Sequence, residues 1–161
     1  MENKLKQIGD LEKIVDTLRQ DKKLIVTTNG TFDILHYAHV ILLQKAKNQG
    51  DVLIVLLNSD ASVKRNKGEK RPIINQYERA MMLSSLQCID YVTIFNEDTP
   101  LKYLEIIKPE FHVKGGSFIK ERINQEKDLV ERNKGVYIVF ELEEGFSTTG
   151  IIDKIMASYN S

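Results

Sequence analysis

The sequence predicts an α/β fold in which helices cover both faces of a doubly wound parallel sheet of five strands. Five short apolar runs, at residues 24–28, 51–57, 91–95, 111–113 and 136–140, alternate with segments of helical periodicity. Within the second run, VLIVLL is apolar at every position, which is typical of a strand buried on both faces of a parallel sheet. Strands joined by helices favour parallel pairing and right-handed crossovers.

Length and composition limit the class of protein. At 161 residues we expect one domain, 1–161, with an N-terminal helical extension at 1–22 and a core at 23–157. Lys plus Arg and Asp plus Glu are equal at 23 each, so no overall positive field indicates a nucleic acid or membrane partner. The single cysteine, Cys88, excludes an intrachain disulfide. The polar start and the lack of a long apolar run predict a soluble, cytoplasmic protein.

The first strand leads into a segment suited to phosphate binding. The pair Asn29-Gly30 predicts a turn, and residues 40–46 show the spacing of a helix. Polar residues cluster where that helix should begin: Thr31, Asp33, His36 and His39. The two histidines are three apart and would share one face of the first helical turn, where unpaired N–H groups and the positive end of the dipole attract anions. The segment therefore predicts a phosphate site.

Two other interpretations of the histidines stay open. Either one could be a helix cap or an ordinary surface residue. The pair could also bind a metal ion, although Asp33 is then the only obvious third ligand nearby.

Polar residues also follow the second strand. Asn58, Ser59 and Asp60 come at its carboxyl end, where open parallel sheets bind ligands, and are candidates for sugar or ribose contacts. The same residues would equally suit a loop that enters a helix.

Residues 61–76 form the most polar stretch, ASVKRNKGEKRPIINQ. It could be a solvated loop, or a mobile arm that brings ammonium groups to phosphates. Asn75 and Glu78 are spaced like a capping pair that opens the next helix. Arg79 would lie in its first turn, which is unfavourable for the helix dipole unless the side chain reaches an anion.

Two further segments are candidate ligand sites. His112 alternates with apolar neighbours in the fourth strand, so we expect it to be buried as a structural residue. Lys114, Gly115 and Gly116 end that strand, and the glycine pair suits either a turn or close approach to a planar ligand. The hydroxyl residues Ser147, Thr148 and Thr149 precede the last helix and would form either an N-cap or a second anion site.

These motifs together resemble a known family. The segment NGTFDILHYAH at 29–39 is similar to the GTFDxxHxGH signature of the cytidylyltransferase-like nucleotidyltransferases, with Ala38 in place of glycine. The resemblance covers most of residues 24–156 and includes Asn58-Ser59-Asp60, Lys67-Gly68, Arg71-Pro72, Arg79, residues 97–100, Lys114-Gly115-Gly116 and residues 144–149. It is closest to the adenylyltransferase module of bacterial D-glycero-D-manno-heptose 1-phosphate enzymes, and glycerol-3-phosphate cytidylyltransferase is more distant.

The resemblance implies a Rossmann-like sheet of strand order 3-2-1-4-5, which places the histidine segment beside Lys114. It implies that the residues acting in catalysis are His36, His39, Lys67 and Arg79. Lys70 is an alternative to Lys67 as the lysine that contacts phosphate. The implied nucleotide contacts are Asn29, Gly30, Thr31, Phe32, His36, His39, Lys114, Gly115, Gly116, Ser147, Thr148 and Thr149. The implied acceptor contacts are Asp33, Asn58, Ser59, Asp60 and Lys67.

The expected reaction is attack by a sugar 1-phosphate, in particular a heptose 1-phosphate, on the α-phosphorus of ATP, with release of pyrophosphate. Mg²⁺ is the expected cofactor, with Asp33 as the nearest protein carboxylate, and the family implies a homodimer. Three alternatives stay open: a cytidylyltransferase for glycerol 3-phosphate or another polyol phosphate, a nucleotide-binding protein weakened in catalysis by Ala38, and a metal-binding protein.

Overall fold

The computed structural model describes residues 2–115, 120–141 and 145–159 and confirms the predicted sheet. Five parallel strands lie in the order β3-β2-β1-β4-β5. Their bounds are β1 Ile25–Gly30, β2 Val52–Asn58, β3 Tyr91–Phe95, β4 Phe111–Gly115 and β5 Val136–Phe140. The order reverses between β1 and β4, which places the ends of these two strands at the topological switch point.

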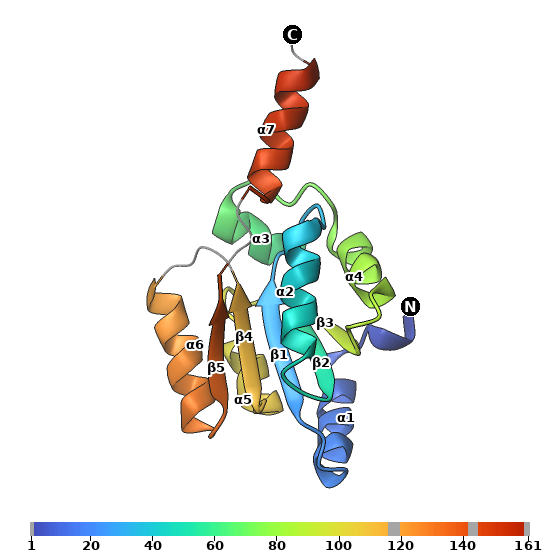
Figure 1. Cartoon of the computed structure of the whole chain (residues 1–161), viewed down its shortest axis with the longest axis vertical. Coiled ribbons are helices and arrows are strands. Elements are labelled where there is room, and N and C mark those ends of the chain that lie inside the picture. Colours follow the sequence, from blue (N-terminus) through green and yellow to red (C-terminus); the bar gives the residue numbers. More distant parts are fainter. Residues whose placement is uncertain (1, 116–119, 142–144, 160–161) are drawn as a thin grey trace.

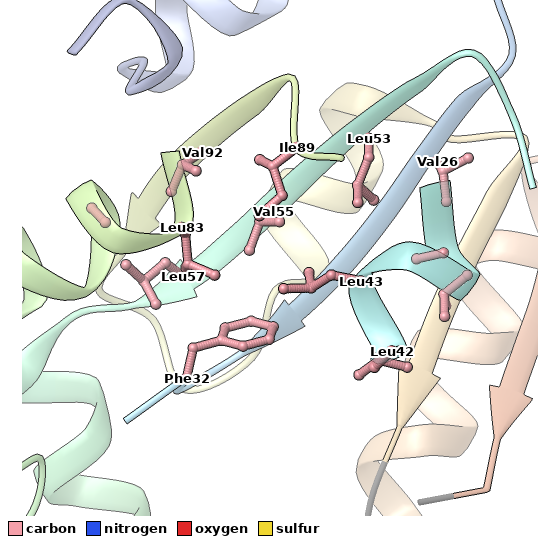
Figure 2. Close-up of a cluster of buried hydrophobic side chains, with 13 residues drawn as sticks. Val26, Phe32, Leu42, Leu43, Leu53, Val55, Leu57, Leu83, Ile89 and Val92 are labelled. Atoms are coloured by element: carbon pink, nitrogen blue, oxygen red, sulfur yellow. The ribbon is translucent and has the colours of Figure 1, made fainter. Parts of the chain in front are cut away.

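Helices cover both faces of the sheet, as Figure 1 shows. The bounds of the helices are η1 Glu2–Lys4, α1 Ile8–Gln20, α2 Tyr37–Lys47, α3 Asp60–Lys67, α4 Gln76–Ser85, α5 Leu101–Ile107, α6 Lys120–Arg132 and α7 Thr148–Tyr159. One core cluster joins α2 and α4 to the sheet (Figure 2), and the second joins α1, α5 and α6 to it. Buried Leu11 and Val15 place α1 in the second cluster, so the expected N-terminal extension packs on the sheet.

The predicted turn at Asn29-Gly30 is wrong, because β1 continues through both residues. Asn29 pairs with Leu56 of β2, and Gly30 pairs with Leu57. The chain changes direction only afterwards, where Phe32 and Ile34 have left-handed φ values of 48° and 50°. Such values are uncommon for bulky residues.

The first half of the predicted polar arm is a helix, α3. Ser59 caps it, since its side-chain oxygen accepts a hydrogen bond from the Ser62 amide. Two residues of α3, Ser62 and Val63, are buried. Lys67 lies in the last turn of the helix, where the dipole favours a cation. The expectation of an irregular arm over this stretch was therefore wrong for its N-terminal half.

The last helix, α7, extends away from the carboxyl-terminal edge of the sheet (Figure 1), and none of its described residues is buried. Among the helices that the structure describes, none is both long and apolar enough to span a membrane.

Candidate functional site

A cavity of about 710 Å³ lies at the carboxyl ends of β1 and β4. This volume is in the range of small-molecule binding sites. Most of the residues predicted from the sequence line it: Asn29, Gly30, Thr31, Phe32, Asp33, His36, His39, Asn58, Lys67, Lys114, Gly115, Ser147, Thr148 and Thr149. The fold therefore gathers segments that are far apart in the sequence around one space. Gly116 falls outside the described residues.

The two imidazoles lie together at the start of α2. His36 is the N-cap residue of this helix, and His39 is in its first turn. Their rings are stacked, with centroids 3.8 Å apart and an interplanar angle of 23°. The His36 side chain makes no capping hydrogen bond in the described structure, and the buried Nδ1 atoms of both rings have no partner among the described residues. Buried polar groups normally have a partner, so the two rings are unusual, and both histidines line the cavity, where a bound ligand would meet them.

Both imidazoles are held in the neutral form. Burial, with smaller contributions from the nearby His36 and Lys67, lowers the pKa of His39 to about 4. Burial also lowers the pKa of His36. At neutral pH each ring therefore offers one N–H donor rather than a full positive charge.

The signature loop is anchored from behind by Phe32 and Asp33. Although it lines the cavity, Phe32 is only 4% exposed, and its ring packs in the cluster with Leu43 and Leu57 (Figure 2). The Asp33 carboxylate accepts hydrogen bonds from Arg71 Nε at 2.7 Å and from the amides of Ile73 and Ile74. Burial raises the pKa of Asp33, but these hydrogen bonds outweigh that effect and hold the pKa below its usual value.

Arg71 lines the cavity but was missing from the predicted site residues. Its side chain is 16% exposed and forms an ion pair with Asp33. Its place in the cation-rich stretch at residues 61–76 was the available signal, but that stretch contains five basic side chains, and nothing in the sequence selects this one. Lys67 also lines the cavity, and burial lowers its pKa, with a further contribution from Arg71.

The start of α7 meets the start of α2 at the cavity. The Thr148 hydroxyl donates a hydrogen bond to the Asp33 carbonyl oxygen at 2.6 Å, and the Phe146 and Tyr37 rings lie 5.0 Å apart. Ser147 accepts a hydrogen bond from the Gly150 amide, so it is also an N-cap. Thr149 lines the cavity and is exposed. Two helix N-termini thus face one space, an arrangement that favours a polyanion.

Arg79 does not reach the cavity, which contradicts its predicted phosphate contact. The side chain is fully buried, and its guanidinium donates to the carbonyl oxygens of Ile74, Thr31 and Asn58 at 2.9, 2.6 and 2.9 Å. A fourth hydrogen bond, of 2.6 Å, reaches Asp60 Oδ1. Arg79 therefore fixes the backbone of the signature loop and of the β2 end, because its donors face protein oxygens.

The predicted acceptor residues after β2 have mainly structural partners. Asp60 pairs with Arg79, and Ser59 both caps α3 and donates to Asn96 Oδ1 at 2.7 Å. Neither residue lines the cavity, so the interpretation as a loop entering a helix is the one the structure supports. Asn58 does line it, although its amide also donates to Ser62 Oγ.

The other side of the cavity is formed by β4 and α6. Gly115 lies against α2, where an added Cβ would come within 2.7 Å of Leu42 side-chain atoms. Its role is close packing, since its backbone is that of an ordinary strand residue. His112 is fully buried, as expected, and its Nδ1 lies 2.7 Å from Thr27 Oγ1. Glu126 of α6 lines the cavity beside Lys114 and was not predicted.

The described side chains do not fit a metal ion held by the protein. They contain no group of three or more His, Cys, Asp or Glu residues that could hold one. The proposed ligand Asp33 already uses both carboxylate oxygens to accept hydrogen bonds from Arg71, Ile73 and Ile74. The paired histidines have no third protein ligand among the described residues. Asp33 as the carboxylate nearest to Mg²⁺ stays a prediction.

Known proteins with similar sequences point to one family. Residues 27–154 match the family described as cytidylyltransferase-like. The chain is 51% identical over 156 residues to the bifunctional protein HldE of Geobacter metallireducens, a match that covers 97% of this chain and 32% of that protein. The bifunctional protein HldE of Helicobacter pylori strain J99 is 49% identical over 155 residues, with 96% and 32% covered. The chain thus spans about a third of the length of these relatives.

Solved structures show the same fold. The lipopolysaccharide core biosynthesis protein from Thermoplasma volcanium superposes with a TM-score of 0.61 at 27% identity, covering 75% of this chain and 97% of that one. Pantoate-beta-alanine ligase from Francisella tularensis, crystallised with beta-gamma ATP and beta-alanine, gives a TM-score of 0.59 at 18% identity, covering 98% and 79%, a likeness of fold alone. With the family match over residues 27–154, the chain belongs to the cytidylyltransferase-like family and is a nucleotidyltransferase.

Proposed function

We propose that the protein transfers AMP from ATP to a sugar 1-phosphate, with a heptose 1-phosphate as its preferred acceptor. The observation that carries this proposal is the stacked pair His36 and His39, which line the cavity where the starts of α2 and α7 meet and whose Nδ1 atoms have no partner among the described residues. The resemblance to heptose 1-phosphate adenylyltransferase modules supports the choice of acceptor. Similarity to a lipopolysaccharide core biosynthesis protein supports it too.

In the proposed reaction, a phosphate oxygen of the sugar 1-phosphate attacks the α-phosphorus of ATP. A new O–P bond forms, the bond from the α-phosphorus to the bridging oxygen breaks, and pyrophosphate leaves with the electron pair. A phosphate monoester is already nucleophilic near neutral pH, so no protein group has to remove a proton. The protein has to align the reactants and stabilise the charge that accumulates on the phosphate oxygens.

The cavity residues suit those two tasks. Neutral His36 and His39 would each donate a hydrogen bond to the α-phosphate region, since their depressed pKa values leave one N–H per ring. Lys67 and Arg71 would hold phosphate oxygens from the α3 side. Thr149 and the first turn of α7 would face the leaving pyrophosphate. Mg²⁺ would enter with the triphosphate as part of the substrate, because the described side chains do not form a site for it.

The test is a screen of pyrophosphate release. ATP, CTP, GTP and UTP are each combined with a heptose 1-phosphate, a hexose 1-phosphate and glycerol 3-phosphate, with acceptor-free reactions as controls. We expect ATP with the heptose 1-phosphate to give the highest kcat/KM. Preference for CTP with glycerol 3-phosphate would establish the alternative substrate pair. Nucleotide binding without pyrophosphate release for any pair would contradict the proposal.

A further inference from the structure

A group of buried and half-buried polar side chains lies on the β4 and α6 side of the cavity. Glu126 is only 3% exposed, and its two carboxylate oxygens lie 3.1 and 3.0 Å from Lys114 Nζ. The Tyr137 hydroxyl donates to Glu126 Oε2 at 3.2 Å, and His112 Nε2 lies 3.6 Å from the same oxygen. Elements β4, α6 and β5 are therefore tied together around one carboxylate.

The same ammonium group reaches the signature segment. Lys114 Nζ donates to Asn29 Oδ1 at 2.7 Å, across the switch point between β4 and β1. An ammonium group has donors only, so it accepts no hydrogen bond and must face the amide oxygen of Asn29. The oxygen of Asn29 is thereby committed to Lys114, and the NH₂ group of this cavity-lining amide is what remains for a ligand.

Glu126 is unsuited to bind a phosphate itself. Burial raises the pKa of Glu126, but the neighbouring His112 ring and the Lys114 ammonium outweigh burial and keep the pKa below its usual value. An ionised carboxylate would repel a triphosphate, and its charge is balanced here by Lys114. Its contacts are to protein side chains on two strands, β4 and β5, which is the environment of a group that orients others.

We propose that Glu126 is a positioning residue for nucleotide binding: it holds the Lys114 ammonium, which in turn fixes Asn29 as a hydrogen-bond donor toward the nucleotide. This inference rests on the proposed nucleotidyl transfer from a nucleoside triphosphate. It assigns a role to a residue on a charged helix that no motif of the sequence marks.

The primary test compares Glu126→Gln with Glu131→Gln in the full chain. Glu131 is on the same helix, but its side chain is 52% exposed and pairs with Lys127 at the surface at 3.8 Å. We expect Glu126→Gln to raise the KM for the nucleotide by about tenfold and to change kcat less than threefold. Glu131→Gln should leave both constants at their wild-type values.

Two double variants separate positioning from a purely structural role. In the Asn29→Ala background, Glu126→Gln should have little further effect on the nucleotide KM, because the two residues act through one chain of contacts. The pair Lys114→Met with Glu126→Gln removes both buried charges together. It should recover thermal stability lost in Glu126→Gln while the raised nucleotide KM persists.

The outcomes are distinguishable from those for the proposed function. If the wild-type chain releases no pyrophosphate with any substrate pair, the proposed function fails and this inference with it. If the wild type is active, an unchanged nucleotide KM in Glu126→Gln overturns this inference alone. Two other results would also overturn it. One is that the effects of Glu126→Gln and Asn29→Ala on the nucleotide KM are additive. The other is that the nucleotide KM returns to the wild-type value in the Lys114→Met and Glu126→Gln double variant once its thermal stability is restored.

Discussion

The two sides of the signature loop differ in how their polar side chains are used. Behind the loop, Arg79 makes four hydrogen bonds to protein atoms, and the Asp33 carboxylate accepts three. On the cavity side, His36 and His39 have buried Nδ1 atoms without a partner in the described part of the chain. Partnered groups hold the loop in a backbone conformation that its bulky residues disfavour, and unpartnered groups are left for the ligand. Substitutions on the two sides should therefore separate stability from activity.

The largest effect on stability should come from substitution of Arg79. Arg79→Met removes donors from three carbonyl groups and from Asp60, so we expect a loss of about 3–5 kcal/mol in the free energy of unfolding. Urea denaturation measures it. The matched control is Arg65→Met, since Arg65 is 45% exposed and pairs with Asp98 at the surface. That variant should lose no more than about 1 kcal/mol.

A stable but inactive Arg79→Met variant would contradict this comparison. It would restore the original expectation that the guanidinium contacts phosphate rather than the carbonyl groups of Thr31 and Asn58.

His39 should give the largest effect on the cavity side. His39→Ala removes the donor that we propose for the reacting phosphate, so we expect kcat to fall on the order of 10²-fold or more. Thermal unfolding should change little, because the Nδ1 atom makes no hydrogen bond within the described chain. Pyrophosphate release with ATP and the acceptor measures the rate. His39→Asn keeps an N–H donor and should retain part of the activity, whereas full turnover in His39→Ala would remove the imidazole from the mechanism.

Most of the fold could be predicted, because strand runs and helix spacing are local properties of the sequence. The sheet order and the meeting of residues 29–39 with Lys114 followed from the resemblance and from the rule for switch points. The helix α3 was missed because its pattern is short and polar, and because its stability depends on the Ser59 cap and on burial of Val63. Such tertiary contacts are not visible in local periodicity.

The site was less predictable where function depends on which side chains become buried. Glu126 lies in a helix with several other charged residues, and nothing in the sequence distinguishes the one that faces Lys114. Arg79 has the residue type of a phosphate ligand, but the carbonyl groups that surround it come from segments joined only in the fold. Residue type predicted the cavity residues well and predicted their partners poorly.

Asp33 should show a smaller effect, with a defined pH dependence. Asp33→Asn places an NH₂ group against the Arg71, Ile73 and Ile74 donors, and we expect a loss of about 2 kcal/mol at pH 7. The folded pKa is lower than the unfolded value of about 3.9, so the stabilisation is complete above that value and is lost as pH falls through the folded pKa. Urea denaturation from pH 7 to pH 3 should show the two proteins converging only in acid. A difference that vanished near pH 6 would point to a histidine instead.

The smallest effect should come from the two lysines at the end of α3 and in the loop after it. Both lysines are exposed, but Lys67 lines the cavity and its surroundings lower its pKa, mainly through partial loss of solvent, whereas Lys70 does not line the cavity. We expect Lys67→Ala to raise the KM for the nucleotide about tenfold, which corresponds to about 1.4 kcal/mol of binding, with no loss of stability. Lys70→Ala is the matched control and should leave the nucleotide KM unchanged. The Lys70 ammonium is outside the cavity and in solvent, where salt screens its charge. Equal effects of the two substitutions would mean that the stretch acts through its overall charge, and the distinction between a cavity side chain and a solvated one would then fail for lysine.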